Sequence, residues 1–92
     1  VYIWDREGFD AIDVQAGPRV LALFEPSHMN FEADRAADKA GEPSLAEMTS
    51  KAVEILRQNK NGYFLMVEGG RIDHAHHGGN AARALKDTQA FS

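Results

Sequence analysis

Residues 67–80, VEGGRIDHAHHGGN, hold the side chains whose types and spacing best suit metal or acid–base chemistry. Ten consecutive residues of this stretch include two carboxylates, three histidines and one arginine. Charged and imidazole groups are unfavourable together away from water unless a counter-charge is present. Because the stretch follows an apolar run, we interpret it as a metal or catalytic site.

The spacing of Asp73 and His77 places both side chains on one helix face, one turn apart. A carboxylate oxygen and a neutral imidazole nitrogen are zinc ligands, and His74 would stand beside the same metal. A catalytic zinc has three protein ligands and an open position, so these residues supply only part of a site. The alternative is a surface histidine cluster flanked by acids.

Two further carboxylates follow apolar runs that resemble buried strands. Glu25 comes directly after residues 19–24 (RVLALF), and Glu68 directly after residues 63–67 (YFLMV). Ligands gather beyond the carboxyl ends of strands in open α/β sheets. Magnesium keeps several of its water molecules and binds through one or two carboxylates, so Glu68 is a candidate magnesium ligand.

The clearest helix covers residues 43–59 and lies between these two strands. Ser44 and Glu47 have the spacing of a capping box, and Glu47 and Lys51 could pair on the exposed side. Its apolar positions define one buried face, namely Leu45, Met48, Ala52, Ile55 and Leu56. Strand, helix and strand in this order predict a parallel strand pair with a right-handed crossover.

The other segments have weaker patterns. Residues 1–4 suit a short strand or a frayed end, and residues 5–18 a loop with at most one helical turn. Residues 27–41 form a polar excursion whose composition favours a solvated surface segment, while its length suggests the alternative that it covers another part of the molecule. Residues 81–91 form a second helix that Asn80 can cap.

Composition narrows the function classes. The 92 residues are 43% hydrophobic and 26% charged, typical of a soluble globular chain, and the net charge of −4 gives no reason to expect nucleic-acid binding. The absence of cysteine excludes disulfides, cysteine–zinc sites and a thiol nucleophile within these residues. Parallel strands need cover on both faces, which one helix cannot give, so we expect an internal part of a longer domain.

The sequence resembles the alkaline phosphatase family. The similarity is nearly continuous, with VEGGRIDHAHH as its most specific segment and LFEP and PSLAEMT as supporting ones. Nucleophile-elbow, P-loop and HExxH motifs are absent. The resemblance implies an α/β fold, here a fragment of a three-layer sandwich with a mostly parallel central sheet and helices on both faces. Residues 1–92 would be an internal part of a single catalytic domain, incomplete at both ends.

The same resemblance implies a homodimeric hydrolase of phosphate monoesters with two zinc ions and one magnesium. By its motif, Glu68 would bind magnesium, Asp73 and His77 would bind one zinc, and His74 would contact the substrate phosphate. Arg71 and His76 match no role. The phosphoserine nucleophile, the phosphate-clamping arginine and the remaining zinc ligands would lie outside these residues, so the isolated chain is expected to be inactive.

A calcium site is also implied, with Phe24 (by its carbonyl), Glu25 and Glu42 as ligands. Glu42 stands where the family has Asp, the preceding loop is longer, and the remaining carboxylate ligand is expected outside the chain. The family implies a periplasmic, secreted or outer-surface location. The alternatives are another metal-dependent hydrolase of the superfamily, such as a phosphodiesterase or sulfatase, or an inactive metal-binding fragment.

Overall fold

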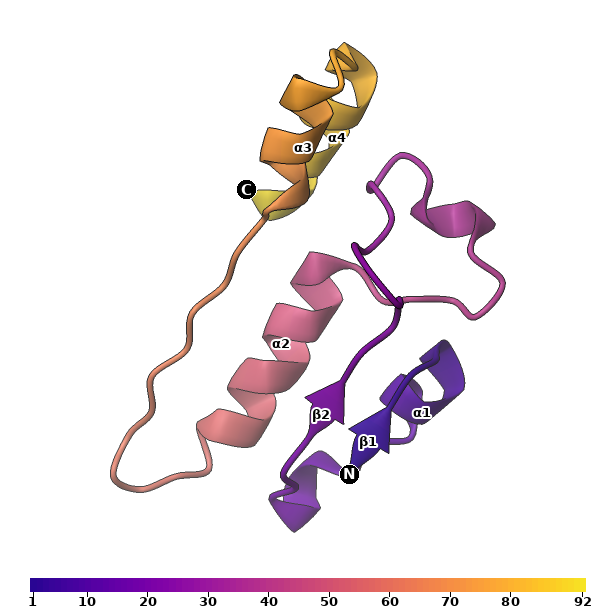
Figure 1. Ribbon diagram of the computed structural model, residues 1–92. Helices are drawn as coiled ribbons and strands as arrows, with labels where there is room; N and C mark the ends of the chain where they lie inside the picture. The colour runs from indigo at the N-terminus through magenta and orange to yellow at the C-terminus, as the bar shows by residue number, and fades with distance from the viewer.

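The computed structural model describes all residues 1–92 as helices and a small parallel sheet, with the longest helix between the sheet and a helical hairpin (Figure 1). The elements are, in order, β1 (Tyr2–Ile3), α1 (Arg6–Asp10), η1 (Val14–Ala16), β2 (Leu21–Ala22), η2 (Arg35–Ala37), α2 (Leu45–Leu56), α3 (Arg71–His77) and α4 (Ala81–Phe91).

The sheet consists of β1 and β2, which pair in parallel with Tyr2 opposite Leu21 and Ile3 opposite Ala22. The run at residues 19–24 is therefore a strand over two residues only. The predicted pairing of this run with residues 63–67 was wrong, because β2 pairs with β1. Of the two interpretations of residues 1–4, the short strand is confirmed.

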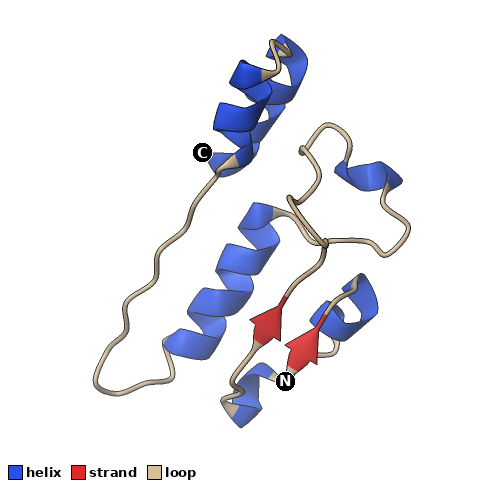
Figure 2. Cartoon of the chain, in the orientation of Figure 1, coloured by secondary structure: helices blue, strands red, loops and turns tan.

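Residues 63–67 are extended but form no backbone–backbone hydrogen bond (Figure 2). The chain leaves α2 and returns along the side of that helix away from β2, so no strand edge faces it (Figure 1). Phe64 is 89% exposed and Met66 is 74% exposed. The prediction of a buried strand here was wrong for this structure, since a strand forms only where a neighbour accepts its hydrogen bonds.

The core lies between α1, the sheet and α2. Ile3, Phe9 and Phe24 are its buried members, and the rings of Phe9 and Phe24 meet edge to face at 6.1 Å. Met48 of α2 packs against this cluster. No residue of α2 is fully buried, so the predicted apolar face is half covered.

The start of α2 confirms the predicted capping box. Ser44 Oγ accepts a hydrogen bond from the Glu47 amide at 3.1 Å, and Glu47 Oε2 accepts one from the Ser44 amide at 2.7 Å. The predicted Glu47–Lys51 pair was wrong. Glu47 instead receives two hydrogen bonds from Arg6 of α1, at 2.9 and 3.0 Å, and the Lys51 ammonium lies 4.8 Å from the Phe9 ring centre.

Residues 5–18 hold more structure than the predicted single turn, because α1 and η1 each begin at a capping aspartate. The predicted second helix and its cap are confirmed, since the Asn80 side chain accepts a hydrogen bond from the Arg83 amide at 3.0 Å. Helices α3 and α4 pack closely as a hairpin. A side chain at Gly69 would meet the Phe91 ring at 2.9 Å, so glycine permits the approach.

Candidate metal sites

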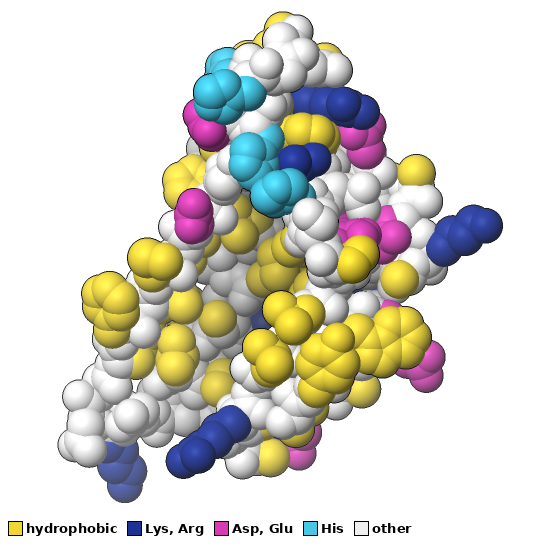
Figure 3. All heavy atoms as spheres, in the orientation of Figure 1, with side chains coloured by type: hydrophobic (Ala, Val, Ile, Leu, Met, Phe, Trp, Pro, Cys, Tyr) yellow, Lys and Arg dark blue, Asp and Glu magenta, His cyan; other side chains and the backbone are white.

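Asp73 and His77 lie together on one face of α3, as their spacing predicts. His77 Nε2 is 3.3 Å from Asp73 Oδ2, and the two side chains are 78% and 75% exposed. Histidine side chains gather over this helix on the molecular surface (Figure 3). A carboxylate oxygen and an imidazole nitrogen this close can share one metal ion, and neither atom is needed by another protein group.

His74 is on the same helix but has different partners. Its ring centre lies 4.3 Å from that of His28, and its Nδ1 is 3.2 Å from Arg71 Nη1. No hydrogen bond joins His74 to Asp73 or His77. His74 is therefore held by the excursion at residues 27–41 and by Arg71, not by Asp73 or His77.

Arg71, for which the sequence suggested no role, lies over the Phe31 ring. Its guanidinium carbon is 3.6 Å from the Phe31 ring centre, and Arg83 approaches the same ring at 4.9 Å. Arg71 Nε is buried without a hydrogen-bond partner, as expected for a guanidinium stacked on an aromatic face. Arg71 thus links the excursion to His74.

The excursion also contacts the helical hairpin through ionic groups. Arg83 pairs with Asp34 at 2.8 Å, and the Glu32 amide donates to the Asp87 carboxylate at 3.3 Å. Burial raises the pKa of Asp87, and the neighbouring Glu32 charge adds to the rise while the Glu32 amide opposes it. Of the two interpretations of residues 27–41, the contacts support the one in which they cover another part of the molecule, although composition favoured a solvated surface segment.

Glu68 is exposed and has no ion pair or hydrogen bond. Its carboxylate lies beside Gly70 at the start of α3. Glu68 and Glu42 line the same open pocket, together with Arg71 and Asp87. A free carboxylate with solvent around it suits a magnesium ion that keeps most of its waters.

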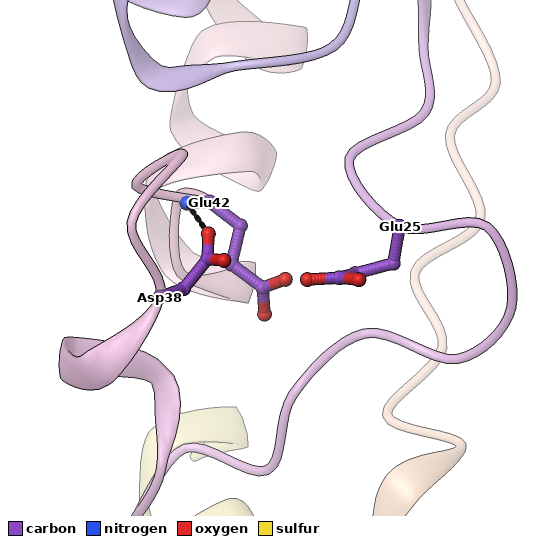
Figure 4. Close-up of side chains that lie close together, drawn as sticks. All are labelled: Glu25, Asp38 and Glu42. Atoms are coloured by element: carbon purple, nitrogen blue, oxygen red, sulfur yellow. Dashed lines mark hydrogen bonds between the residues drawn. The ribbon is translucent and has the colours of Figure 1, made fainter.

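A second cluster contains the predicted calcium ligands Glu25 and Glu42, and it adds Asp38. One oxygen from each lies within 4.8 Å of the others, and Glu42 is only 2% exposed. Figure 4 shows Glu25 pointing across to the Glu42 carboxylate, with Asp38 on the other side. Asp38 also accepts a hydrogen bond from the Glu42 amide at 2.8 Å. Phe24 has its ring in the core, so only its backbone could serve as a ligand.

Asn30 connects the two glutamates of this cluster. Its backbone nitrogen donates to Glu42 Oε1 at 2.9 Å. Its side-chain Nδ2 donates to Glu42 Oε2 at 3.2 Å and to Glu25 Oε1 at 3.1 Å. Burial raises the pKa of Glu42 and the Glu25 side chain contributes to the rise, while the Asn30 hydrogen bonds oppose it. Three oxygen donors with excess negative charge are the chemistry that calcium prefers.

Sequence reasoning missed Asp38, His28 and Asn30 as members of these clusters. All three lie in the polar excursion, where composition indicates a solvated surface. The only signal was the length of the excursion, which exceeds that of a plain connection.

The chain thus carries two separate clusters of side chains whose donor atoms suit metal ions, one on α3 and one around Glu42. The sequence matches the alkaline phosphatase family over residues 1–92, and the chain belongs to that family. The match covers the two clusters and the segment between them.

Individual relatives agree with this assignment. The chain is 45% identical over 86 residues to the tissue-nonspecific isozyme of alkaline phosphatase from Gallus gallus, which covers 94% of this chain and 16% of the relative. It is 42% identical to a membrane-bound alkaline phosphatase of Bombyx mori, over 95% of this chain and 16% of the relative. It is 40% identical to an alkaline phosphatase of Gadus morhua, over 94% of this chain and 18% of the relative.

The chain thus spans about a sixth of the length of these relatives. None of its own helices has the length and apolar character that crossing a bilayer requires.

Proposed function

We propose that the protein containing this chain is an alkaline phosphatase that hydrolyses phosphate monoesters. It would act with two zinc ions, one magnesium ion and a phosphoserine intermediate whose serine lies outside these residues. The observation that carries the proposal is the family match over residues 1–92, combined with Asp73 and His77 side by side on α3.

Asp73 and His77 fit a zinc ion by donor type and by their 3.3 Å separation. When bound, zinc lowers the pKa of a coordinated water and stabilises negative charge on oxygen. The chain's own contribution is to hold both donors on one rigid helix face. His74 would offer its imidazole to the substrate phosphate from the same helix.

Glu68 would hold the magnesium, since its carboxylate is exposed and free of other partners. The cluster around the buried Glu42 would hold calcium through Glu25, Glu42 and the Phe24 carbonyl. Asp38 stands close enough to add a third carboxylate. The raised pKa of Glu42 supports a cation here, because a buried carboxylate near another is stabilised by a positive charge.

The three-layer sandwich with a mostly parallel sheet is also part of the proposal. Residues 63–67 support it, because an extended apolar segment with free amides and carbonyls suits a strand with neighbours on both sides. Residues 1–92 would then be one part of a single larger catalytic domain. We further propose a homodimer with a secreted, periplasmic or outer-surface location, as the family resemblance implies.

Hydrolysis of p-nitrophenyl phosphate by the whole protein tests the activity. We expect turnover at alkaline pH that is lost after metal removal and restored by zinc with magnesium. The isolated 92-residue chain should show none, because the nucleophile lies elsewhere. A whole protein that hydrolyses a phosphodiester or sulfate ester faster than a phosphate monoester would contradict the proposal.

A further inference from the structure

We infer that His28 is a positioning residue, which sets the orientation of the His74 imidazole toward the phosphate group of the substrate. The inference rests on the proposed function, because it takes the phosphate contact of His74 from there. It adds a residue of the polar excursion to the machinery of α3.

The contact between the two imidazoles is direct. The ring centres of His28 and His74 are 4.3 Å apart, and the ring planes are inclined by 56°. His28 lies in an exposed part of the excursion, whereas His74 is half-buried on α3. The His28 ring therefore covers one side of the His74 ring and restricts its rotation.

A second contact restrains His74 at a specific atom. Arg71 Nη1 lies 3.2 Å from His74 Nδ1. A guanidinium can only donate, so Nδ1 is the acceptor and the ring proton resides on Nε2. With Nδ1 occupied and one ring side covered, the Nε2–H group remains to donate to an anionic oxygen such as that of a phosphate.

The excursion contacts both His74 and its neighbour Arg71. His28 packs on His74, and Phe31, three residues further along, lies 3.6 Å beneath the Arg71 guanidinium. The excursion is attached to α4 independently, through Asp34 and Arg83 at 2.8 Å. Loss of the His28 ring should consequently leave His74 restrained by Arg71 alone, without detaching the excursion.

Three variants of the whole protein test the inference. His28→Ala removes the ring, His28→Phe keeps a ring of similar size, and His76→Ala removes an exposed imidazole of α3 that has no side-chain partner. We expect His28→Ala to lower kcat/KM for p-nitrophenyl phosphate about tenfold, mainly through a higher KM, because a His74 imidazole that is no longer oriented binds the phosphate group less well.

His28→Phe should retain most of the activity, and His76→Ala should match the unmodified protein. Zinc content and Tm should be unchanged in all three variants. Unchanged kcat/KM in His28→Ala would overturn the inference. An equal loss of kcat/KM in His28→Ala and His28→Phe would also overturn it, as would a loss of zinc in His28→Ala.

A measurement without catalysis separates this inference from the proposed function. In metal-stripped protein with ¹³C-labelled histidine, the His74 ring resonances should shift in His28→Ala, because the neighbouring ring current is lost. They should not shift in His76→Ala. Unmoved His74 resonances would overturn the ring contact itself. If the resonances shift but the unmodified protein hydrolyses no phosphate monoester, the proposed function fails and the ring contact stands.

Discussion

The two metal-type clusters of this chain differ in how their donors are held. On α3, Asp73 and His77 are exposed, and the helix alone sets their 3.3 Å separation. In the second cluster, Glu42 is 2% exposed and Asn30 and Asp38 surround it with hydrogen bonds. The first cluster offers donors at little desolvation cost, whereas the second holds a buried negative charge that a cation would stabilise.

The difference predicts different consequences for the two clusters. Changes on α3 should affect catalysis more than stability, because exposed side chains contribute little to the fold. Changes at Glu42 should affect stability and its dependence on cations, because burial makes the charge state part of the folding free energy. The excursion at residues 27–41 contacts Glu42 through Asn30, and it contacts α3 through His28 and His74.

The largest effect is expected on the α3 face. In the whole protein, Asp73→Ala or His77→Ala should reduce phosphate monoester hydrolysis about a thousandfold, since a bound metal supplies several kcal/mol of transition-state stabilisation. Zinc content should fall with the activity, and Tm of the metal-free protein should hardly change. His76→Ala is the matched control on the same helix. Full zinc occupancy in His77→Ala would contradict the assignment of His77 as a zinc ligand.

Glu68→Gln should have the next largest effect. We expect magnesium to be lost and zinc to be retained, with activity about 10- to 100-fold lower because the zinc ligands remain in place. Metal analysis after dialysis measures both ions in one sample. Zinc lost with magnesium retained would reverse the assignment of Glu68.

Glu42→Gln should change stability and not the zinc site. Because burial raises the Glu42 pKa, its charged form opposes folding above that pKa, and calcium should offset this at neutral pH. Calcium should therefore raise Tm by a few degrees at neutral pH, and less as the pH falls through the raised pKa. In Glu42→Gln the rise should disappear.

Glu54→Gln is the matched control for this experiment, because Glu54 is exposed and has no ion pair. Calcium should raise its Tm as it does that of the unmodified protein. An equal rise in Glu42→Gln would show that calcium binds elsewhere.

The smallest effect concerns the ion pair between Arg6 and Glu47. The Arg6 hydrogen bonds lower the pKa of Glu47 to about 2 from the ordinary 4.5, with the Ser44 amide contributing. A lowered pKa stabilises the fold above the ordinary value, and this stabilisation is lost as the pH falls from 4.5 toward 2.

Arg6→Ala should remove much of that acid-dependent stabilisation. At neutral pH it should cost about 1 kcal/mol or less, because exposed ion pairs are screened by solvent. Thermal unfolding at several pH values measures the slope, and Arg57→Ala, an exposed arginine without an ion pair, is the control. Identical slopes for the two variants would mean that the pair contributes nothing to acid stability.

Local sequence rules predicted the features that depend on neighbours a few residues apart. The capping box of Ser44 and Glu47, the Asn80 cap and the Asp73–His77 pair all follow from helix geometry over one turn. The family resemblance then gave Glu25 and Glu42 a common role, and the structure brings their carboxylates close together.

Long-range contacts decided what those rules could not. Apolar content marked residues 63–67 as a strand, but strand formation depends on a neighbouring edge, and β2 pairs with β1 instead. Periodicity likewise paired Glu47 with Lys51, while α1 brings Arg6 to the same carboxylate. Both errors have one cause, because the partner comes from a distant part of the chain.

The sequence by itself determined the family, the helices α2 and α4 with their caps, and the placement of Asp73 and His77 on one helix face, since these depend on residue identity and local spacing. The tertiary structure alone decided that the polar excursion turns inward. It places Asn30 against Glu42 and His28 against His74, contacts between residues at least 12 positions apart that no local pattern contains. The physical reason is that burial and pairing are properties of surfaces that meet only after the chain has folded.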